Sequence, residues 1–278
     1  VFLTGVTGLV GQMVLFDLLR QGAAVSSRGV ASGGLRAVVV LVRGKKGVAP
    51  SDRLASISDS AMFRPLRESG AWRRGGAVVV AVEGELGGEG LGLSAESRAL
   101  LAGAGVTHAL HCAASVSFSD PLAEAAATNV TGALRVAALV ASWPSCGTLI
   151  HVSTAFVHGG KSGTASCPLP QELPDLGGRS PERLYRSAQR APSASDAGGG
   201  SGGGGGAGKE ALDAMADLGY PNTYTFTKAL GEHLLVRALS AHNRRLDRVV
   251  RPSIVGPAWV FPWPGWTGEQ PSTVTGEP

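Results

Sequence analysis

Six short runs of apolar, largely β-branched residues recur along the sequence, and longer segments of helix-forming composition separate them. Strands that are buried on both faces of a sheet have this continuous apolar character. The expected strands are 1–4, 37–42, 77–82, 108–111, 148–152 and 248–250. Strands that alternate with helices predict βαβ units arranged around a parallel sheet.

Helical patterns occur between these runs, at 11–21, 94–102, 121–142 and 224–239. The third segment has the clearest start, because Asp120 can cap the helix and Pro121 can occupy the first helical position, where a missing N–H costs nothing. Together the patterns predict an α/β fold of Rossmann type, with a doubly wound parallel sheet and helices on both of its faces.

Length and composition fit a single domain of this class. With 278 residues and 44% hydrophobic residues, the chain can bury one large core. Residues 193–208 are Ser, Ala, Asp and mostly Gly, which predicts a flexible surface insertion. The βα pattern resumes after it, so we expect one domain over 1–266 and a tail over 267–278. Because the sequence opens within a strand, we expect it to be a piece of a longer protein.

Charge and cysteine spacing argue against several classes of protein. The formal net charge is +4, and the basic residues are scattered apart from a cluster at Arg43, Lys45 and Lys46. This favours a local anion site over a nucleic-acid-binding face. Three widely spaced cysteines argue against a disulfide framework and a zinc cage, and we expect no metal. The same cysteine pattern predicts an intracellular, reducing compartment. No run of about 18 apolar residues occurs, so we expect no spanning helix.

A glycine-rich segment follows the first expected strand and leads into an apolar helix. Three glycines in this context allow a tight turn, close approach to a pyrophosphate and close packing of helix on strand. The helix N-terminus then offers free N–H groups to the phosphates. A plain strand-to-helix turn is the alternative. The cofactor-binding residues expected here are Thr4, Gly5, Thr7, Gly8, Leu9, Val10 and Gly11.

The end of the second strand indicates which dinucleotide is bound. A carboxylate at this position would hold the ribose hydroxyls of NAD and repel the extra phosphate of NADP. Here the strand ends at Arg43, and Lys45 and Lys46 follow. A cationic loop suits a 2′-phosphate, so we predict NADPH, with a solvated basic turn as the alternative. Glu85, after the third strand, is expected near the adenine.

Tyr224 and Lys228 lie one helical turn apart and therefore on one face of the last helix. A phenol, with a pKa of about 10, is a poor proton donor at neutral pH unless a cation stabilises its phenolate. Lys228 can supply that cation and hold the nicotinamide ribose. An ordinary exposed helix pair is the alternative.

The fifth strand ends in two hydroxyls, Ser153 and Thr154. One of them can donate a hydrogen bond to the reacting carbonyl oxygen, or each can bond its own backbone. Asn129, inside the third helical segment, is expected to support a proton relay to Lys228 or to bind a backbone carbonyl.

These residues together resemble the short-chain dehydrogenase/reductase superfamily in its extended form, and more narrowly the alcohol-forming fatty acyl-coenzyme A reductases of the male-sterility type. The narrower resemblance rests on the phrases at 113–118, 120–122, 129–132, 151–155, 221–230, 250–256 and 264–266. In it Gly5, Gly8 and Gly11 match the cofactor loop, Tyr224 and Lys228 the catalytic pair, and Thr154 the strand-end hydroxyl, with Ser153 beside it. Further cofactor contacts are expected at Ala113, Ala114, Asn129 and Pro252.

This chain departs from the family pattern at Leu9, where an aromatic residue is usual, at His158, where Asn is frequent, and in the glycine-rich insertion. The resemblance also implies a smaller C-terminal domain that this sequence does not contain, and membrane-surface association through such missing parts. The aromatic segment 259–266 is expected either to line the acyl channel or to pack beneath that domain.

By the same resemblance, the function is NADPH-dependent reduction of long-chain fatty acyl-CoA to a primary alcohol by way of an aldehyde, with release of CoA. The alternatives are an aldehyde-releasing thioester or carboxylic acid reductase domain, an NAD-dependent sugar-nucleotide epimerase or dehydratase, and a non-catalytic NADPH-binding protein. Cys112 is not expected to accept the acyl group, because it ends a buried strand.

Overall fold

The computed structural model describes residues 1–27, 34–45, 47–72, 78–193, 207–242 and 248–268. Within these ranges, six strands form one parallel sheet in the order β3-β2-β1-β4-β5-β6. The strand order reverses between β1 and β4, which is where ligands bind in sheets of this kind. The strands are β1 (Phe2–Thr4), β2 (Ala37–Val42), β3 (Val78–Glu83), β4 (His108–His111), β5 (Thr148–Val152) and β6 (Arg248–Val250).

All six expected strands are present, and their bounds differ from the expected ones by at most one residue, with position 77 outside the described residues. The helical elements are α1 (Leu9–Ser27), α2 (Pro50–Asp59), η1 (Ala61–Phe63), α3 (Arg64–Glu68), η2 (Glu89–Gly92), α4 (Ala95–Gly103), α5 (Leu122–Ala126), η3 (Ala127–Thr131), α6 (Gly132–Ala141), α7 (Pro181–Ala188), α8 (Lys209–Asp217) and α9 (Thr223–Ala241).

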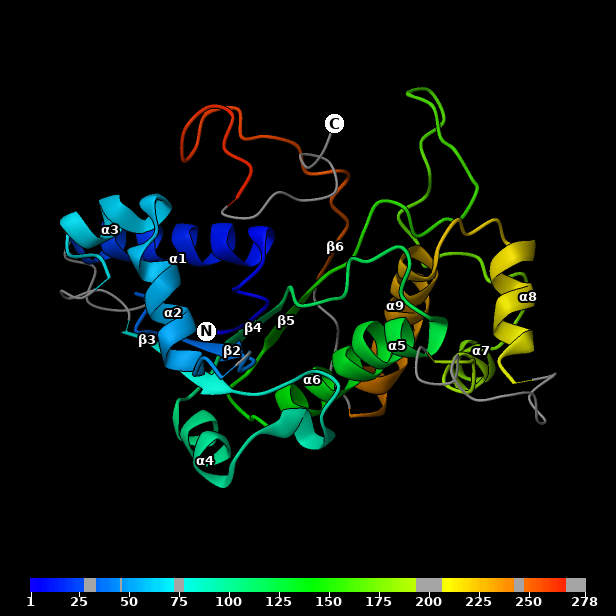
Figure 1. Ribbon diagram of the computed structural model, residues 1–278, viewed down its shortest axis with the longest axis horizontal. Helices are drawn as coiled ribbons and strands as arrows, with labels where there is room; N and C mark the ends of the chain where they lie inside the picture. Colours follow the sequence, from blue (N-terminus) through cyan, green and yellow to red (C-terminus); the bar gives the residue numbers. More distant parts are fainter. Residues whose placement is uncertain (28–33, 46, 73–77, 194–206, 243–247, 269–278) are drawn as a thin grey trace.

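Helices cover both faces of the sheet, as expected for a doubly wound fold (Figure 1). Because side chains alternate along a strand, β2 contributes side chains to the hydrophobic clusters on both faces of the sheet. Val39 and Leu41 pack with α4, α6 and α9, whereas Val38 and Val40 pack with α1, α2 and α3. A third cluster joins α5, α7 and α8 to the outer side of α9. The sheet is thereby held rigid beneath the loops that follow its strands.

The expected helix 121–142 differs from its prediction at its start and in its middle. It begins at Leu122 with Pro121 at the N-cap position, so the predicted cap by Asp120 is wrong. The Asp120 carboxylate instead accepts a hydrogen bond from Ser115, and its backbone carbonyl accepts one from Thr223. A π turn, η3, then interrupts the helix and contains Asn129. Asp120 therefore ties the loop after β4 to the start of α9.

Most of the expected glycine-rich insertion, residues 194–206, lies outside the described residues, as do the last ten residues of the tail. The chain that follows the insertion forms α8 and α9 and then returns to the sheet as β6 beside β5. Within the described ranges, each helix is too short or too polar to cross a bilayer.

Candidate active site

A cleft of about 1990 Å³ lies along the carboxyl ends of the strands. Residues that follow β1, β4 and β5 line it, so it spans the point at which the strand order reverses. Every site residue predicted from the sequence lines this cleft, apart from Asn129, which is buried beside it, and Lys46, which lies outside the described residues. The fold thus brings together residues from both halves of the chain.

The three glycines after β1 differ in how much space their surroundings leave for a side chain. Gly5 has a φ of +82°, and a Cβ there would lie 2.6 Å from the Ala113 nitrogen. A Cβ on Gly11, in the first turn of α1, would lie 2.1 Å from the Gly5 oxygen. A Cβ on Gly8 would meet only that same oxygen, at the ordinary distance of 3.5 Å. The fold therefore requires Gly5 and Gly11, whereas Gly8 leaves open space on the side of the cleft.

Thr4, at the end of β1, joins this loop to β4. Its hydroxyl oxygen accepts a hydrogen bond from the Ala113 backbone at 3.2 Å and lies 2.7 Å from Nδ1 of His111. Thr7, Leu9, Val10, Ala113 and Ala114 all line the cleft around it. A glycine-rich loop beside a helix N-terminus fits the pyrophosphate of a dinucleotide.

The basic end of the cleft lies after β2. The Arg43 guanidinium donates a 2.9 Å hydrogen bond to Glu85, and both side chains are more than half exposed. Lys45 lines the cleft nearby. Arg53, on α2, also lines it and donates to the Arg43 backbone carbonyl. Arg53 is not predicted from the sequence, although Pro50 and Asp52 are the residue types that start a helix and would have located α2.

Tyr224 lies in the first turn of α9, which begins beside the end of β5. Asn222 caps this helix, because its side-chain oxygen accepts a 2.9 Å hydrogen bond from the Thr225 backbone. Burial raises the pKa of Tyr224, and interaction of the phenol with the adjacent Thr154 side chain opposes that rise. Thr154 is therefore the strand-end hydroxyl that meets the phenol.

Lys228 lies one turn further along α9 and is only 2% exposed. Its Nζ donates a 2.6 Å hydrogen bond to the backbone carbonyl of Val152. Burial lowers the pKa of Lys228 to about 8, while Glu232 and Cys112 act in the opposite direction. The ammonium is thus held at the end of β5, two residues before Thr154.

Two buried histidines, His111 and His151, lie beneath Lys228, with their rings 5.2 Å apart. Burial and the nearby Lys228 lower the pKa of both, so both imidazoles are neutral at physiological pH. Burial raises the pKa of Cys112 to about 11. Its thiol is therefore protonated at neutral pH and a poor nucleophile.

The two remaining polar candidates have other surroundings. Ser153 is buried, and its Oγ has no hydrogen-bond partner among the described residues. The Asn129 amide donates to the Ser115 carbonyl and to the Thr227 hydroxyl, each at 3.1 Å, and its oxygen accepts from the Ser115 backbone at 2.8 Å. Asn129 therefore binds a backbone carbonyl, as one of the two alternatives predicted. Its side chain also connects the loop after β4 to α9.

The aromatic segment 259–266 does not belong to the lining of the cleft. Trp266 is 7% exposed and packs in the core beside α1, and Phe261 stacks on Phe16 with ring centroids 4.4 Å apart. Trp259, in contrast, is 90% exposed. This segment covers α1 (Figure 1). The residues after β6 that line the cleft are Pro252 to Val255 and Gly268.

Comparison with known proteins places this site in a family. The model of the male sterility proteins, a family of NAD-binding domains, matches residues 3–276. The chain belongs to the male sterility protein family. Membership of this family makes the chain a nicotinamide-dinucleotide-binding domain, and the glycine cradle and cationic loop of the cleft fit that cofactor.

Curated relatives of this male sterility domain include a putative fatty acyl-CoA reductase of Drosophila melanogaster, 31% identical over 269 residues, and fatty acyl-CoA reductase 1 of Mus musculus, 29% identical over 266 residues. Each comparison covers 96% of this chain and 45% of the relative. The domain therefore spans less than half the length of these relatives.

Solved structures with a similar fold include reductase domains. The terminal R domain from the myxalamid PKS-NRPS biosynthetic pathway matches with a TM-score of 0.58 and 21% identity, over 92% of this chain and 49% of that one. The reductase domain of a nonribosomal peptide synthetase from Mycobacterium tuberculosis matches with a TM-score of 0.51 and 19% identity, over 92% and 48%. The predicted Rossmann-type fold, a doubly wound parallel sheet with helices on both faces, is confirmed.

Proposed function

We propose that this male sterility domain reduces long-chain fatty acyl-CoA with NADPH, releasing CoA, and reduces the resulting aldehyde to a primary alcohol. The observation that carries the proposal is that the Tyr224 phenol meets the Thr154 side chain in the lining of the cleft, with the Lys228 ammonium held at the same strand end. A protein that only binds a dinucleotide has no need of a proton donor at this position.

Different groups of cleft residues would bind the different parts of NADPH. The glycine cradle and the start of α1 would hold the pyrophosphate, and Arg43, Lys45 and Arg53 would surround the 2′-phosphate. Lys228 would hold the nicotinamide ribose, with Pro252 beside the ring. When bound, the cofactor supplies the hydride that both reduction steps consume.

Thr154, after β5, and Tyr224, on α9, would act on the oxygen of the substrate. Thr154 and Tyr224 would donate hydrogen bonds to the thioester carbonyl oxygen, which makes the acyl carbon more electrophilic and stabilises the oxyanion that forms there. Collapse of this oxyanion restores a carbonyl and expels CoA as its thiolate. The product of this first step is an aldehyde.

A proton is required when the aldehyde becomes an alcohol. The Tyr224 phenol would transfer its proton to the alkoxide oxygen, and the Lys228 ammonium would stabilise the phenolate that remains. Because Lys228 is fixed by the Val152 carbonyl, its charge need not be reorganised during the reaction. Tyr224 therefore serves both steps.

The basic loop after β2 supports NADPH over NAD. Arg43 and Arg53 converge there, since Arg53 donates to the Arg43 backbone. A sugar-nucleotide epimerase that retains NAD would not need this cluster of cations. The aldehyde-releasing alternative shares the whole site and differs only in the second step.

Product analysis tests the proposal. The chain is incubated with palmitoyl-CoA and excess NADPH, and free thiol, oxidised cofactor and lipid product are measured together. We expect a primary alcohol with two NADPH oxidised for each CoA released. Aldehyde with one NADPH per CoA would restrict the domain to the first step, and no release of CoA would contradict the proposal.

A further inference from the structure

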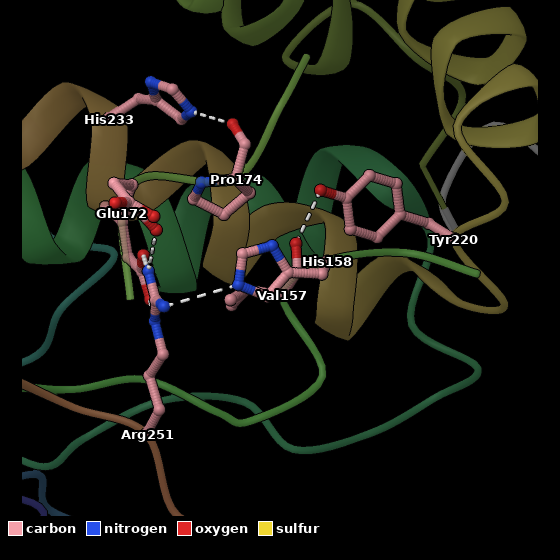
Figure 2. A network of polar contacts seen from close by, with 8 residues as sticks. Val157, His158, Glu172, Pro174, Tyr220, His233 and Arg251 are labelled. Carbon is pink, nitrogen blue, oxygen red and sulfur yellow. Dashed lines mark hydrogen bonds and ion pairs between the residues drawn. The ribbon is translucent and has the colours of Figure 1, made fainter. Parts of the chain in front are cut away.

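A buried ion pair between Glu232 and Arg251 links α9 to the chain after β6. Figure 2 shows Arg251 with its neighbours His158 and Glu172. The Arg251 guanidinium donates to both carboxylate oxygens of Glu232, from Nε at 2.9 Å and from Nη2 at 2.6 Å. Glu232 is completely buried and the Arg251 side chain is 13% exposed. Burying two charges is costly, and the remaining guanidinium contacts offset part of that cost. These are the Glu172 carbonyl at 2.9 Å and the His158 Nε2 at 3.4 Å.

Glu232, the acidic partner, lies on the face of α9 that also carries Tyr224 and Lys228. Glu232 lies one turn beyond Lys228, and Lys228 lies one turn beyond Tyr224. Residues four apart on a helix share one face, so Arg251 is anchored to the same stripe of α9. The pair itself lies outside the lining of the cleft. Its action on a substrate would therefore be indirect.

Arg251, the basic partner, belongs to a segment that is hydrogen-bonded to the residues around Thr154. The Ser153 backbone donates to the Val250 carbonyl at 2.7 Å, and the Ala155 backbone donates to the Pro252 carbonyl at 2.8 Å. The two neighbours of Thr154 are thus bonded to the two neighbours of Arg251. Fixing Arg251 relative to α9 consequently fixes Thr154 relative to Tyr224.

We propose that Arg251 and Glu232 are a positioning pair that sets the separation between the Thr154 hydroxyl and the Tyr224 phenol. The catalytic consequence of this inference rests on the proposed function. A bidentate ion pair suits the task, because its two parallel hydrogen bonds define both distance and orientation. Apolar side chains of similar volume would fill the space without defining either.

Two further contacts hold the loop between β5 and α7 and do not involve the ion pair (Figure 2). The Tyr220 hydroxyl donates to the Val157 carbonyl at 2.7 Å, and the His233 ring lies 2.7 Å from the Pro174 carbonyl. Loss of the ion pair would therefore leave this loop attached to α9. The expected change is local to the strand end at Thr154.

The test replaces both charges together, in the double variant Glu232→Leu/Arg251→Met. Replacing a whole buried ion pair by apolar residues often leaves stability unchanged, whereas removing one partner strands a charge. We expect an unfolding temperature close to that of the wild type, a Kd for NADPH within about twofold, and a kcat lowered about 10- to 100-fold by misplacement of the reacting groups.

A matched control removes a surface pair, Arg179→Met/Asp217→Leu. These side chains form a 2.6 Å ion pair outside the cleft. We expect this variant to retain the kcat of the wild type. A wild-type kcat in the Glu232→Leu/Arg251→Met variant would overturn the inference, because the pair would then serve stability alone.

A second readout needs no substrate. In protein labelled with ¹³C at tyrosine Cζ, the Tyr224 resonance is identified by its loss in Tyr224→Phe, and Thr154→Val gives its position without the Thr154 hydroxyl. We expect the resonance of Glu232→Leu/Arg251→Met to move toward that of Thr154→Val. A resonance at the wild-type position would overturn the inference. If the wild type reduces no acyl-CoA, the proposed function fails while this readout still decides the role of the pair.

Discussion

The Lys228 ammonium donates a 2.6 Å hydrogen bond to the backbone carbonyl oxygen of Val152, the last residue of β5. This contact joins α9 to the strand end that carries Thr154. Because the lysine is almost fully buried, its charge acts in a region of low dielectric constant, where interactions between charges are stronger than in water. The position of the Lys228 ammonium is therefore fixed by burial and by this hydrogen bond to β5.

The pH dependence of turnover follows from this burial. Because the pKa of Lys228 is lowered to about 8, kcat should fall as the pH rises through about 8 and the ammonium loses its proton. In Lys228→Arg the guanidinium stays protonated, so the fall should move to higher pH even if the maximal rate is lower. The measurement is kcat against pH for both proteins. A wild-type rate that is constant between about pH 7 and 9.5 would contradict this role.

Arg43→Ala should weaken NADPH binding far more than NADH binding. A hydrogen bond to a charged group contributes about 1.5–3 kcal/mol, which corresponds to roughly 10- to 100-fold in Kd. NADH lacks the 2′-phosphate, so its Kd should change by less than about threefold. Arg20→Ala, which removes an exposed side chain on α1 that pairs with Asp17, is the control. Equal losses for the two cofactors would refute the phosphate assignment.

Alanine substitutions should separate the fold-forming glycines from the ligand-facing one. Gly11→Ala pushes a methyl group into the Gly5 carbonyl, and overpacking of this kind costs about 1–3 kcal/mol or more in the free energy of unfolding. Gly8→Ala meets no such neighbour and should change that free energy little. Its Kd for NADPH should nevertheless rise at least tenfold, because the methyl group occupies the space expected for the pyrophosphate. Denaturant unfolding and cofactor titration of both variants check this contrast.

Trp266→Ala should destabilise the domain, whereas Trp259→Ala should not. The first empties a site in the core beside α1, for which losses of about 3–5 kcal/mol are typical. The second removes an exposed side chain and should change the free energy of unfolding by less than about 0.5 kcal/mol. Chemical denaturation of the two variants measures the difference. Similar stability losses would contradict the packing described for this segment.

The strands and the cleft residues were predictable because their signals are local. A buried parallel strand is apolar throughout, and Gly5, Gly8 and Gly11 follow the first strand at once. Tyr224 and Lys228 share a helical face by spacing alone. Their place at the cleft follows from a sheet topology that the alternation of strands and helices already implies.

Features that depend on distant contacts were not predictable in this way. The helices α2, α3, α7 and α8 have ten residues or fewer, and such short helices depend on tertiary packing more than on their own periodicity. Asp120 has the right residue type for a cap, but the Ser115 hydroxyl competes for its carboxylate. The pairing of Glu232 with Arg251 joins α9 to the end of β6. Its only local signal is an acidic residue within an otherwise apolar stretch of helix.

The measurement that tests the central claim most directly is turnover of the Tyr224→Phe variant with acyl-CoA and NADPH. Loss of the proton donor should lower kcat on the order of 100-fold or more while the Kd for NADPH stays within about twofold. Tyr185→Phe, which alters a tyrosine that contacts Thr131 outside the cleft, should keep the wild-type rate. A Tyr224→Phe variant that turns over as fast as the wild type would contradict the account.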